Sequence, residues 1–324
     1  MVTLKQVANA AGVHLTTASA VLNSSKGNTR VGEAACKRVW KVAKELGYVR
    51  NESARRLRTG ESNAVGLIGG DLRNPFFSEL AATLERELQR HDLQLVLSHV
   101  SSIQSTTFSK TVEIFHQQTI RKILFWDESA SRAAPEAPAN CVLFPIGFTV
   151  RSRPGVWLDL GHAIRLAVSY FVEQKRSRIC FYAPTGQMES PSVAIRKRIF
   201  VDECRRQGVP PPICANYDGE SWSIEAAIRG ARQLIKQDTA IEAFVGFNDV
   251  AALGLLLATG DLRPKPIVIC FDGTSLTRQW PGRPPVFDLK ISGLVQQAVA
   301  VFLGRQTLDV TSRKEHWLRP ELIV

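Results

Sequence analysis

Apolar residues gather in short, dense runs along most of the chain, and amphipathic stretches separate many of these runs. The runs are typical of buried β-strands: AVGLIGGD (64–71), LQLVLSHV (93–100), RKILFWD (121–127), CVLFPIGF (141–148), VWLDL (156–160), RICFYAP (178–184), EAFVGFN (242–248) and PIVICFDG (266–273). The stretches between them have helical spacing: 77–91, 107–118, 161–175, 192–207, 223–237 and 249–259. This alternation predicts an α/β fold whose parallel sheets carry helices on both faces.

The first fifty residues have a different pattern, that of three short helices. The stretch LKQVANAA (4–11) predicts a helix with one apolar face, which Thr3 can cap. Gly12 follows, and a second short helix is expected over 14–23. Two short helices joined by a tight glycine turn are typical of a helix-turn-helix. A third helix is expected over 33–46, so the chain begins with an all-α module.

Polar residues directly follow several of the apolar runs. In open parallel sheets, ligands bind beyond the carboxyl ends of the strands. That rule directs attention to residues 71–77, to Asn248 with Asp249, and to Asp272.

Charge separates the amino-terminal module from the rest of the chain. The 324 residues suggest two domains or a little more, because a domain typically has about 150 residues. The net charge is +11, but residues 1–60 contain eleven Lys and Arg against three Glu, a net +8, and the remainder carries only +3. A small basic head on a near-neutral body is typical of a polyanion-binding module attached to a second function. An ordinary solvated basic surface is the alternative at this point.

Cysteine usage and hydropathy predict a cytoplasmic protein. The six cysteines are scattered, without a CxxC pair or a His/Cys cluster, which is typical of free thiols in a reducing compartment and not of a metal site. The amino-terminal MVTLKQVANA has no apolar segment of a signal peptide. The longest apolar run, 250–258, is about half of what a bilayer span needs. We therefore expect no membrane association.

In order and spacing, the motifs resemble those of the lactose-repressor/galactose-repressor (LacI/GalR) family of bacterial transcription factors over essentially the whole chain. The motifs are TLKQVANAAGV (3–13), T-x-S-x-V-L-N (17–23), ELGYVRN (45–51), A-R-x-L-R-T-G (54–60), GLIGGDLRNPFF (66–77), Arg196 ahead of Phe200, FNDVAALG (247–254), CFDG (270–273) and LRPELIV (318–324). The resemblance implies a helix-turn-helix head, a hinge helix, and a two-lobed effector domain built like a periplasmic sugar-binding protein. It also implies a homodimer.

The resemblance divides the chain into three parts. The helix-turn-helix domain covers 1–49, the hinge helix 50–62, and the effector-binding and dimerisation domain 63–324. Within the last part, the N-lobe is expected at about 63–160 plus 289–324, and the C-lobe at about 161–288.

In this family the second helix, here 14–23, enters the major groove. Three of its residues match positions that bind backbone phosphates and three match positions that read bases. They are, in that order, Thr17, Ser19 and Asn23, and Leu15, Thr16 and Ala20. Relatives most often have arginine, which grips guanine, at the place of Ala20. We therefore expect A·T pairs in the operator there. A packing-only role for this helix is the alternative.

The hinge residues supply a second contact with DNA. Arg55, Arg56 and Arg58 surround Leu57, which matches the leucine that relatives insert into a central minor-groove step to kink the duplex. Two hinge helices must lie side by side, so a dimer and a roughly palindromic operator follow. An ordinary core leucine is the alternative for Leu57. Gly32 stands where relatives place a Ser or Thr cap, which weakens the third helix slightly.

The resemblance places the effector between the two lobes. The expected contacts are carboxylates, an amide, a guanidinium, hydroxyls and aromatic rings, a set that suits a hydroxyl-rich ligand such as a sugar. They are Asp71, Phe76, Phe77, Phe148, Asp159, Ser190, Ser192, Arg196, Trp222, Asn248 and Asp272. For Phe76, Phe148 and Trp222 a core role is the alternative, and Asp272 can instead cap a turn. Ile199 replaces a glycine common in relatives and can shift the helix of Arg196 or narrow the site.

These observations predict a sequence-specific DNA-binding regulator, a repressor whose operator binding is modulated by a small molecule, expected to be a sugar. The alternative is a regulator of the same fold that answers to a protein partner or has no small-molecule effector. We find no nucleophile elbow, Walker loop, metal-ligand spacing or dinucleotide fingerprint, so neither an enzyme nor a cofactor is expected. Without an apolar heptad tail, we expect a dimer and not a tetramer.

Overall fold

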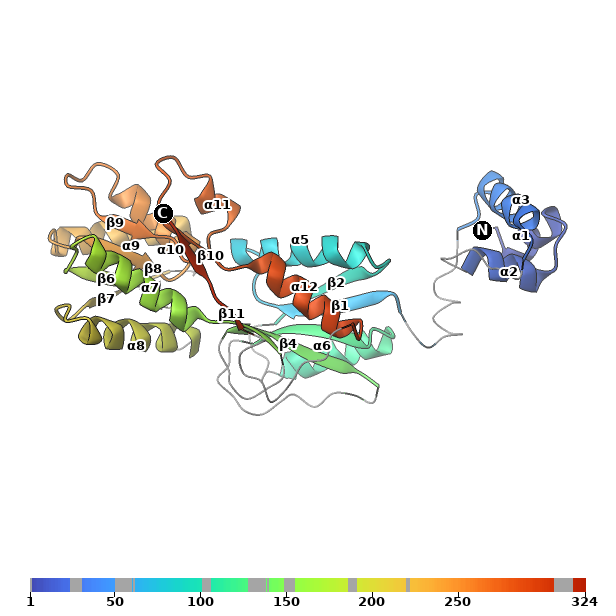
Figure 1. The fold of residues 1–324 in the computed structure, drawn as a ribbon, viewed down its shortest axis with the longest axis horizontal. Coiled ribbons are helices and arrows are strands. Elements are labelled where there is room, and N and C mark those ends of the chain that lie inside the picture. Colours follow the sequence, from blue (N-terminus) through green and yellow to red (C-terminus); the bar gives the residue numbers. More distant parts are fainter. Residues whose placement is uncertain are drawn as a thin grey trace. The chain divides into compact units, whose positions relative to one another are not determined.

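The structure, a computed structural model, divides into two compact units, residues 1–61 and residues 62–324 (Figure 1). It describes residues 2–23, 31–49, 60, 62–100, 106–127, 138, 140–148, 155–185, 191–219, 222–305 and 317–324.

The first unit is a three-helix module with a small core of its own. Its helices are α1 (Leu4–Ala10), α2 (Leu15–Asn23) and α3 (Glu33–Glu45). Val7, Ala18 and Val39, one from each helix, are completely buried against one another. Thr3 begins α1 with a capping box: its hydroxyl accepts from the Gln6 backbone, and its own N–H donates to the Gln6 side chain at 2.8 Å.

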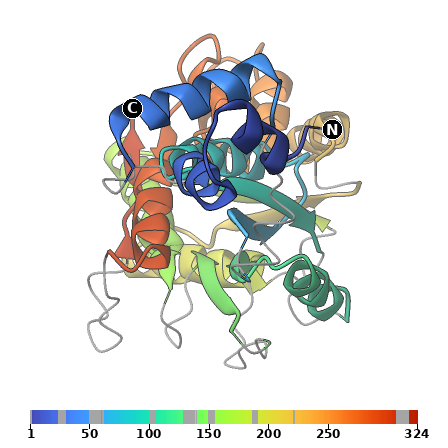
Figure 2. The same ribbon diagram turned by 90° about the vertical axis from the view of Figure 1, so that its right-hand side faces the viewer.

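The second unit contains two parallel sheets, each the centre of a lobe (Figure 1). The N-lobe sheet has the strand order β11-β5-β4-β3-β1-β2. Its strands are β1 (Ala64–Gly69), β2 (Gln94–His99), β3 (Lys122–Asp127), β4 (Val142–Phe148), β5 (Val156–Leu158) and β11 (Trp317–Leu318). Helices α5 (Pro75–Gln89) and α12 (Ile291–Phe302) cover one face, and α6 (Thr106–Gln117) covers the other (Figure 2).

The C-lobe sheet has four parallel strands in the order β7-β6-β8-β9. They are β6 (Ile179–Pro184), β7 (Ile213–Tyr217), β8 (Ala243–Gly246) and β9 (Ile267–Ile269). Helices α7 (Leu160–Glu173) and α8 (Pro191–Arg206) pack on one face, and α9 (Ile224–Gln237) and α10 (Asp249–Ala258) pack on the other. A short helix, α11 (Ser275–Arg278), follows β9.

The apolar core runs through both lobes. One continuous cluster joins the α5 and α12 face of the N-lobe to the α7 and α8 face of the C-lobe. An antiparallel pair, β10 (Val286–Asp288) with β12 (Glu321–Ile323), lies where the chain returns from the C-lobe, and β12 also contacts α7. The lobe limits derived above place these two strands in different lobes, and those limits remain a prediction.

The predicted fold class is confirmed: helix-turn-helix helices precede two parallel α/β sheets. All eight apolar runs contain strands, and all six amphipathic stretches contain helices. The sequence reading missed β7, α11, α12 and β10. Across the described ranges, no helix is long and apolar enough to cross a membrane.

Candidate functional site

Helix α2 presents a mostly uncharged outer face in the head unit. Leu15 is 44% exposed and Thr16 is exposed, whereas Thr17, Ser19 and Ala20 are half-buried. The opposite side of α2 packs into the head core through Ala18, Val21 and Leu22. The backbone of Asn23 ends the helix. The residues predicted to read bases therefore lie on the side of α2 that is not in the core.

A histidine fixes the first turn of this helix. The Nδ1 atom of His14 lies 2.8 Å from the hydroxyl oxygen of Thr16 and 3.3 Å from its backbone nitrogen. The imidazole therefore caps the start of α2 and orients the Thr16 side chain. The predicted hinge residues Arg55, Arg56, Leu57 and Arg58 lie outside the described residues.

In the N-lobe, the loop after β1 is held by an ion pair within the loop. The Asp71 carboxylate accepts from Nε of Arg73 at 2.9 Å and from Nη2 at 2.6 Å. These bonds to Arg73 hold the pKa of Asp71 below its ordinary value. Asn74 then caps α5 by accepting from the Phe76 backbone at 3.0 Å. The Asp71 carboxylate is thus ionised and oriented toward Arg73 in the same loop.

Phe76 and Phe77 are core residues, only 2% and 6% exposed. Both rings meet Trp126 on β3 edge to face, with centroids 5.0 Å and 5.1 Å from it. Such edge-to-face contacts are stabilising beyond the burial of the rings. Phe76 therefore packs in the core, as the alternative for this residue expected. Ligand contact by either ring remains a prediction.

In the C-lobe, Arg196 on α8 is buried at the carboxyl end of β8. Its Nη1 donates to the carbonyl oxygen of Phe247 at 2.7 Å. Its guanidinium carbon lies 4.4 Å from the Phe247 ring centre and 4.5 Å from that of Phe271, which are cation–π distances. Ser192 is one helical turn earlier on α8 and is also buried. The strand ends and α8 thus converge on the guanidinium.

Asn248 and Asp272 lie in this same region and are 3% and 5% exposed. Asn248 caps α10, because its Oδ1 accepts from the Ala251 backbone at 2.8 Å. Within the described residues, the Nδ2 atom of Asn248 has no hydrogen-bond partner. Asp272 accepts from the Asp249 backbone at 3.3 Å. Ser192, Arg196, Asn248 and Asp272 therefore form one buried set, called the polar group below.

Asp249 builds the loop that carries Asp272. Its completely buried carboxylate accepts five hydrogen bonds: from the backbones of Asp272 (2.9 Å), Gly273 (3.2 Å) and Thr274 (2.8 Å), and from the hydroxyls of Thr274 and Thr277 (both 2.7 Å). Burial raises the pKa of this carboxyl, and the five donors oppose that rise. The sequence pointed to Asp249 only as a residue at a strand end. Its structural role was missed.

Gly273 is required in the same loop. Its φ is +56°, and a Cβ there would lie 1.8 Å from the carbonyl oxygen of Phe287. The tight turn after β9 brings Asp272 and the two threonines around Asp249.

Two other predicted effector contacts lie close to helix starts. Asp159 caps α7, accepting from the His162 backbone at 2.8 Å, and its carboxylate is 3.8 Å from Arg165. Trp222 is half-buried just before α9. Ser190 and the side chain of Phe148 lie outside the described residues.

Ile199 is accommodated by a glycine on the neighbouring helix. A Cβ built on Gly161 of α7 would lie 3.0 Å from Cδ1 of Ile199. Ile199 packs against the main core from α8. The bulky side chain thus points to α7, where Gly161 leaves room for it.

One contact between the lobes was not expected from the sequence. A Glu79 carboxylate oxygen on α5 accepts a hydrogen bond from the backbone N–H of Ser275, at the start of α11. Figure 1 shows α11 beside the first turns of α5. Because Ser275 follows the loop organised by Asp249, this bond connects the N-lobe to the loop of Asp272. No local sequence signal indicates such a pairing.

Known proteins are similar to this chain in both of its units. The family description "Bacterial regulatory proteins, lacI family" matches residues 3–51. The ribose operon repressor of Bacillus subtilis (strain 168) is 28% identical over 275 residues, which cover 83% of this chain and 80% of the relative.

Two solved structures resemble the whole chain. The lac repressor dimer bound to operator and the anti-inducer ONPF superimposes with a TM-score of 0.78 at 19% identity, covering 100% of this chain and 98% of the other. A transcriptional regulator CelR–cellobiose complex superimposes with a TM-score of 0.60 at 17% identity, covering 100% and 99%. At these identities the likeness shows the fold.

The amino-terminal head, residues 3–51, matches the lacI family of bacterial regulatory proteins, and the relatives and the fold of the whole chain agree with that family. This assignment implies a DNA-binding regulator and not an enzyme.

Proposed function

We propose that the protein is a homodimeric repressor in the bacterial cytoplasm whose operator binding is modulated by a small hydroxyl-rich ligand, a sugar, bound at the polar group between the lobes. The observation that carries the proposal is the convergence of Ser192, Arg196, Asn248 and Asp272, all buried, beyond the strands of the C-lobe sheet. A cationic donor, an amide and a carboxylate together complement the mixed donors and acceptors of sugar hydroxyls.

Asn248 gives the strongest support for a polar ligand. Its side chain is almost fully buried, and its Nδ2 lacks a protein acceptor in the described structure. A buried N–H without a partner costs free energy, and a ligand hydroxyl that accepts from it would remove that cost. The solved CelR complex with cellobiose has the same fold and supports a sugar as the ligand class.

For the head, we propose that Leu15, Thr16 and Ala20 contact base edges and that Thr17, Ser19 and Asn23 bind phosphates. The lac repressor dimer, solved on its operator, supports the major-groove position of α2. Leu15 and Ala20 offer only apolar contact, which suits thymine methyl groups. Selection of operators from random DNA with the full-length protein tests this assignment. We expect A·T pairs opposite Ala20, whereas strong selection of guanine there would contradict it.

For ligand control, the test is a thermal-shift screen of full-length protein against sugars and sugar phosphates, repeated with Asn248→Ser and Asp272→Ala. Serine caps a helix about as well as asparagine, so Asn248→Ser removes the amide donor and leaves α10 capped. We expect at least one sugar to raise the melting temperature of the wild type and to lose most of that effect with either variant.

If no sugar stabilises the protein, the result favours the alternative, a regulator controlled by a protein partner or without a small-molecule effector. The observation behind this alternative is that Arg196 already contacts Phe247 and Phe271, and Asp71 already pairs with Arg73. A screen without any hit, or hits that both variants retain in full, would count against the polar group as the effector site.

A further inference from the structure

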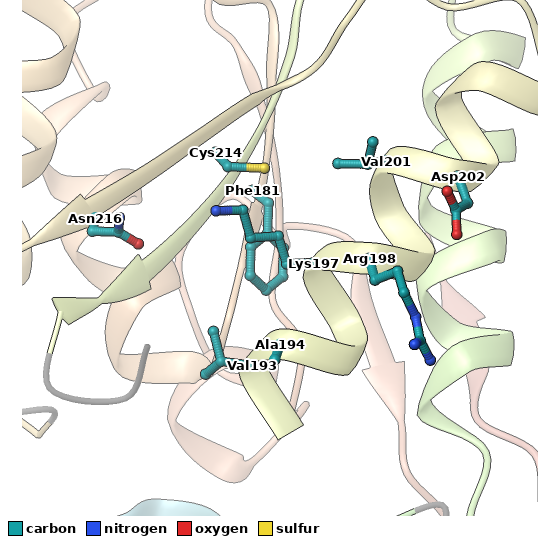
Figure 3. A pocket seen from close by; sticks show the side chains of 9 residues that line it. All are labelled: Phe181, Val193, Ala194, Lys197, Arg198, Val201, Asp202, Cys214 and Asn216. Atoms are coloured by element: carbon teal, nitrogen blue, oxygen red, sulfur yellow. The ribbon is translucent and has the colours of Figure 1, made fainter. Parts of the chain in front are cut away.

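A second pocket lies in the C-lobe, away from the polar group. It has a volume of about 420 Å³ and is formed by β6, the edge strand β7 and helix α8 (Figure 3). None of the residues predicted to bind DNA or effector lines it. Its size falls within the range of about 300–1,000 Å³ typical of small-ligand sites, toward the small end.

The pocket lies on a different side of α8 from Arg196. Val193, Lys197 and Val201 recur at every fourth position and therefore form one stripe along the helix. Facing them, Cys214 and Asn216 alternate along β7 and thus share one face of the sheet, and Cys214 pairs with Phe181 of β6. The site is built from regular elements on all of these sides.

The floor of the pocket is apolar and neutral. Phe181 and Val193 are buried, and the half-buried Cys214 lies beside them. Burial raises the pKa of the Cys214 thiol, which therefore stays uncharged near pH 7. The floor can take up an apolar body and adds no negative charge.

Lys197 is the cation beside this floor. Figure 3 shows its side chain reaching toward Cys214, with Asn216 on the same strand as Cys214. Arg198 and Asp202 also line the pocket, and Asp202 is paired with Arg205 at 3.4 Å. Because Arg198 and Asp202 carry opposite charges, the lining has one net positive charge. Among the residues that the structure describes, no carboxylate forms an ion pair with Lys197. A single ammonium and an amide donor match one negative charge.

We propose that this pocket binds a small monocarboxylic acid with an apolar body, its carboxylate on Lys197 and Asn216 and its body against Phe181, Val193 and Cys214. A single positive charge favours a monoanion over a phosphate dianion, because a dianion would leave one charge unmatched. The apolar floor distinguishes such an acid from acetate, which has too little apolar surface to bury.

The test is isothermal titration calorimetry on the full-length protein with benzoate and hexanoate. Acetate supplies the charge without the body, and benzamide and hexanamide supply the body without the charge. We expect benzoate or hexanoate to bind and the three control compounds to bind at least about tenfold more weakly. The amides lack the charge, and hydrogen bonds to charged groups are stronger than those between neutral groups. Acetate lacks the apolar body.

Three variants locate the binding. Lys197→Met keeps the chain length and removes the charge, so it should weaken binding about tenfold or more. Arg229→Met removes a positive charge from an exposed position on α9, which covers the other face of the sheet, and should change affinity by less than about twofold. Asp272→Ala, in the polar group, should leave binding unchanged.

Three results would overturn the proposal. The first is that neither carboxylate binds the wild type. The second is that Arg229→Met weakens binding as much as Lys197→Met, which would indicate attraction to a diffuse positive surface. Loss of binding with Asp272→Ala would place the acid at the polar group. Melting curves of each variant verify that the fold is retained.

Discussion

The carboxylate of Asp249 supports the loop on which the position of Asp272 depends. It is completely buried and accepts from three backbone N–H groups and two hydroxyls. Removing it leaves five donors without an acceptor in the interior, and each unsatisfied buried group costs about 1–3 kcal/mol. The geometry of Asp272 is thus maintained by a residue that need not touch the ligand.

We therefore predict that Asp249→Ala lowers the free energy of unfolding by about 3–5 kcal/mol, a typical cost for removing one partner of a buried charged network. Urea unfolding of the full-length protein measures this loss. Asp202→Ala is the matched control, because that carboxylate is exposed and its ion pair with Arg205 contributes about 0–1 kcal/mol. Equal, small effects of both substitutions would show that the Asp249 network is not needed for stability.

Gly32 allows a test in the head. It precedes α3 without a side-chain cap, at φ −57° and ψ 144°, and a Cβ there would meet nothing within 4 Å. We predict that Gly32→Ser stabilises the first turn of α3 by a few tenths of a kcal/mol and that Gly32→Ala destabilises it. Hydrogen exchange at the amides of Ala35 and Cys36 reports this order. Equal protection in both variants would show that the cap has no effect.

Among single residues, the sequence predicted the polar group better than the aromatic contacts. Arg196, Asn248 and Asp272 follow or face strand ends, and the rule for parallel sheets locates such positions directly. The rings of Phe76 and Phe77 instead meet Trp126, about fifty positions away in the chain. No local pattern encodes that partner, so the sequence offered a core role for Phe76 only as an alternative.

At the scale of elements, the fit of α8 on α7 depends on Ile199 and Gly161. The isoleucine is close enough that a methyl group on Gly161 would meet its Cδ1 at 3.0 Å. Gly161 lies in the first turn of α7, and alanine is otherwise more stable than glycine in a helix, by up to about 1 kcal/mol in its interior. The clash and the helix propensity therefore act in opposite directions on Gly161→Ala.

We predict that Gly161→Ala is neutral or destabilising in the wild type and stabilising by up to about 1 kcal/mol in an Ile199→Ala background. A double-mutant cycle of unfolding free energies measures the coupling, which should be at least about 0.5 kcal/mol for residues in contact. Additive effects would mean that the two helices adjust without strain and that Ile199 does not determine the position of α8.

Strands that form dense apolar runs were predicted, including the edge strands β2 and β9, and elements without such a run were missed. Dense apolar runs are typical of parallel strands covered by helices. The missed β7 lies at a sheet edge and is mostly half-buried. Helix α12 begins at Lys290, which has a left-handed φ of 56° and no side-chain cap, so the usual start signal is absent.

At the scale of the whole molecule, one edge of the N-lobe sheet has no neighbouring strand among the described residues and suits a second copy. Strand β2 ends the six-stranded sheet, and its Leu97 is 44% exposed. Proteins usually protect such edges, and an apolar one is typical of an interface. This surface supports the proposed homodimer.

We predict that Leu97→Lys weakens dimerisation and with it operator affinity, because a desolvated lysine opposes a twofold contact. Sedimentation equilibrium measures the monomer fraction. Val172→Lys on α7 is the matched control, since Val172 is also a partly exposed apolar residue, 38% exposed, but lies in the other lobe. A wild-type protein that is monomeric, or equal effects of the two variants, would contradict the assignment of β2.

The central proposal is that a ligand bound at the polar group changes how tightly the head binds DNA. A ligand can do so only if it binds two conformations of the effector domain with different affinities. Fluorescence anisotropy with a selected operator, with and without the sugar that gives the largest thermal shift, tests it most directly. We predict that the sugar changes the operator Kd of the wild type at least about tenfold, a coupling typical of allosteric regulators. Asn248→Ser should bind the operator as the wild type does without sugar and should not respond to it. An unchanged Kd in the wild type, or an equal response of the variant, would contradict control of the operator through the polar group.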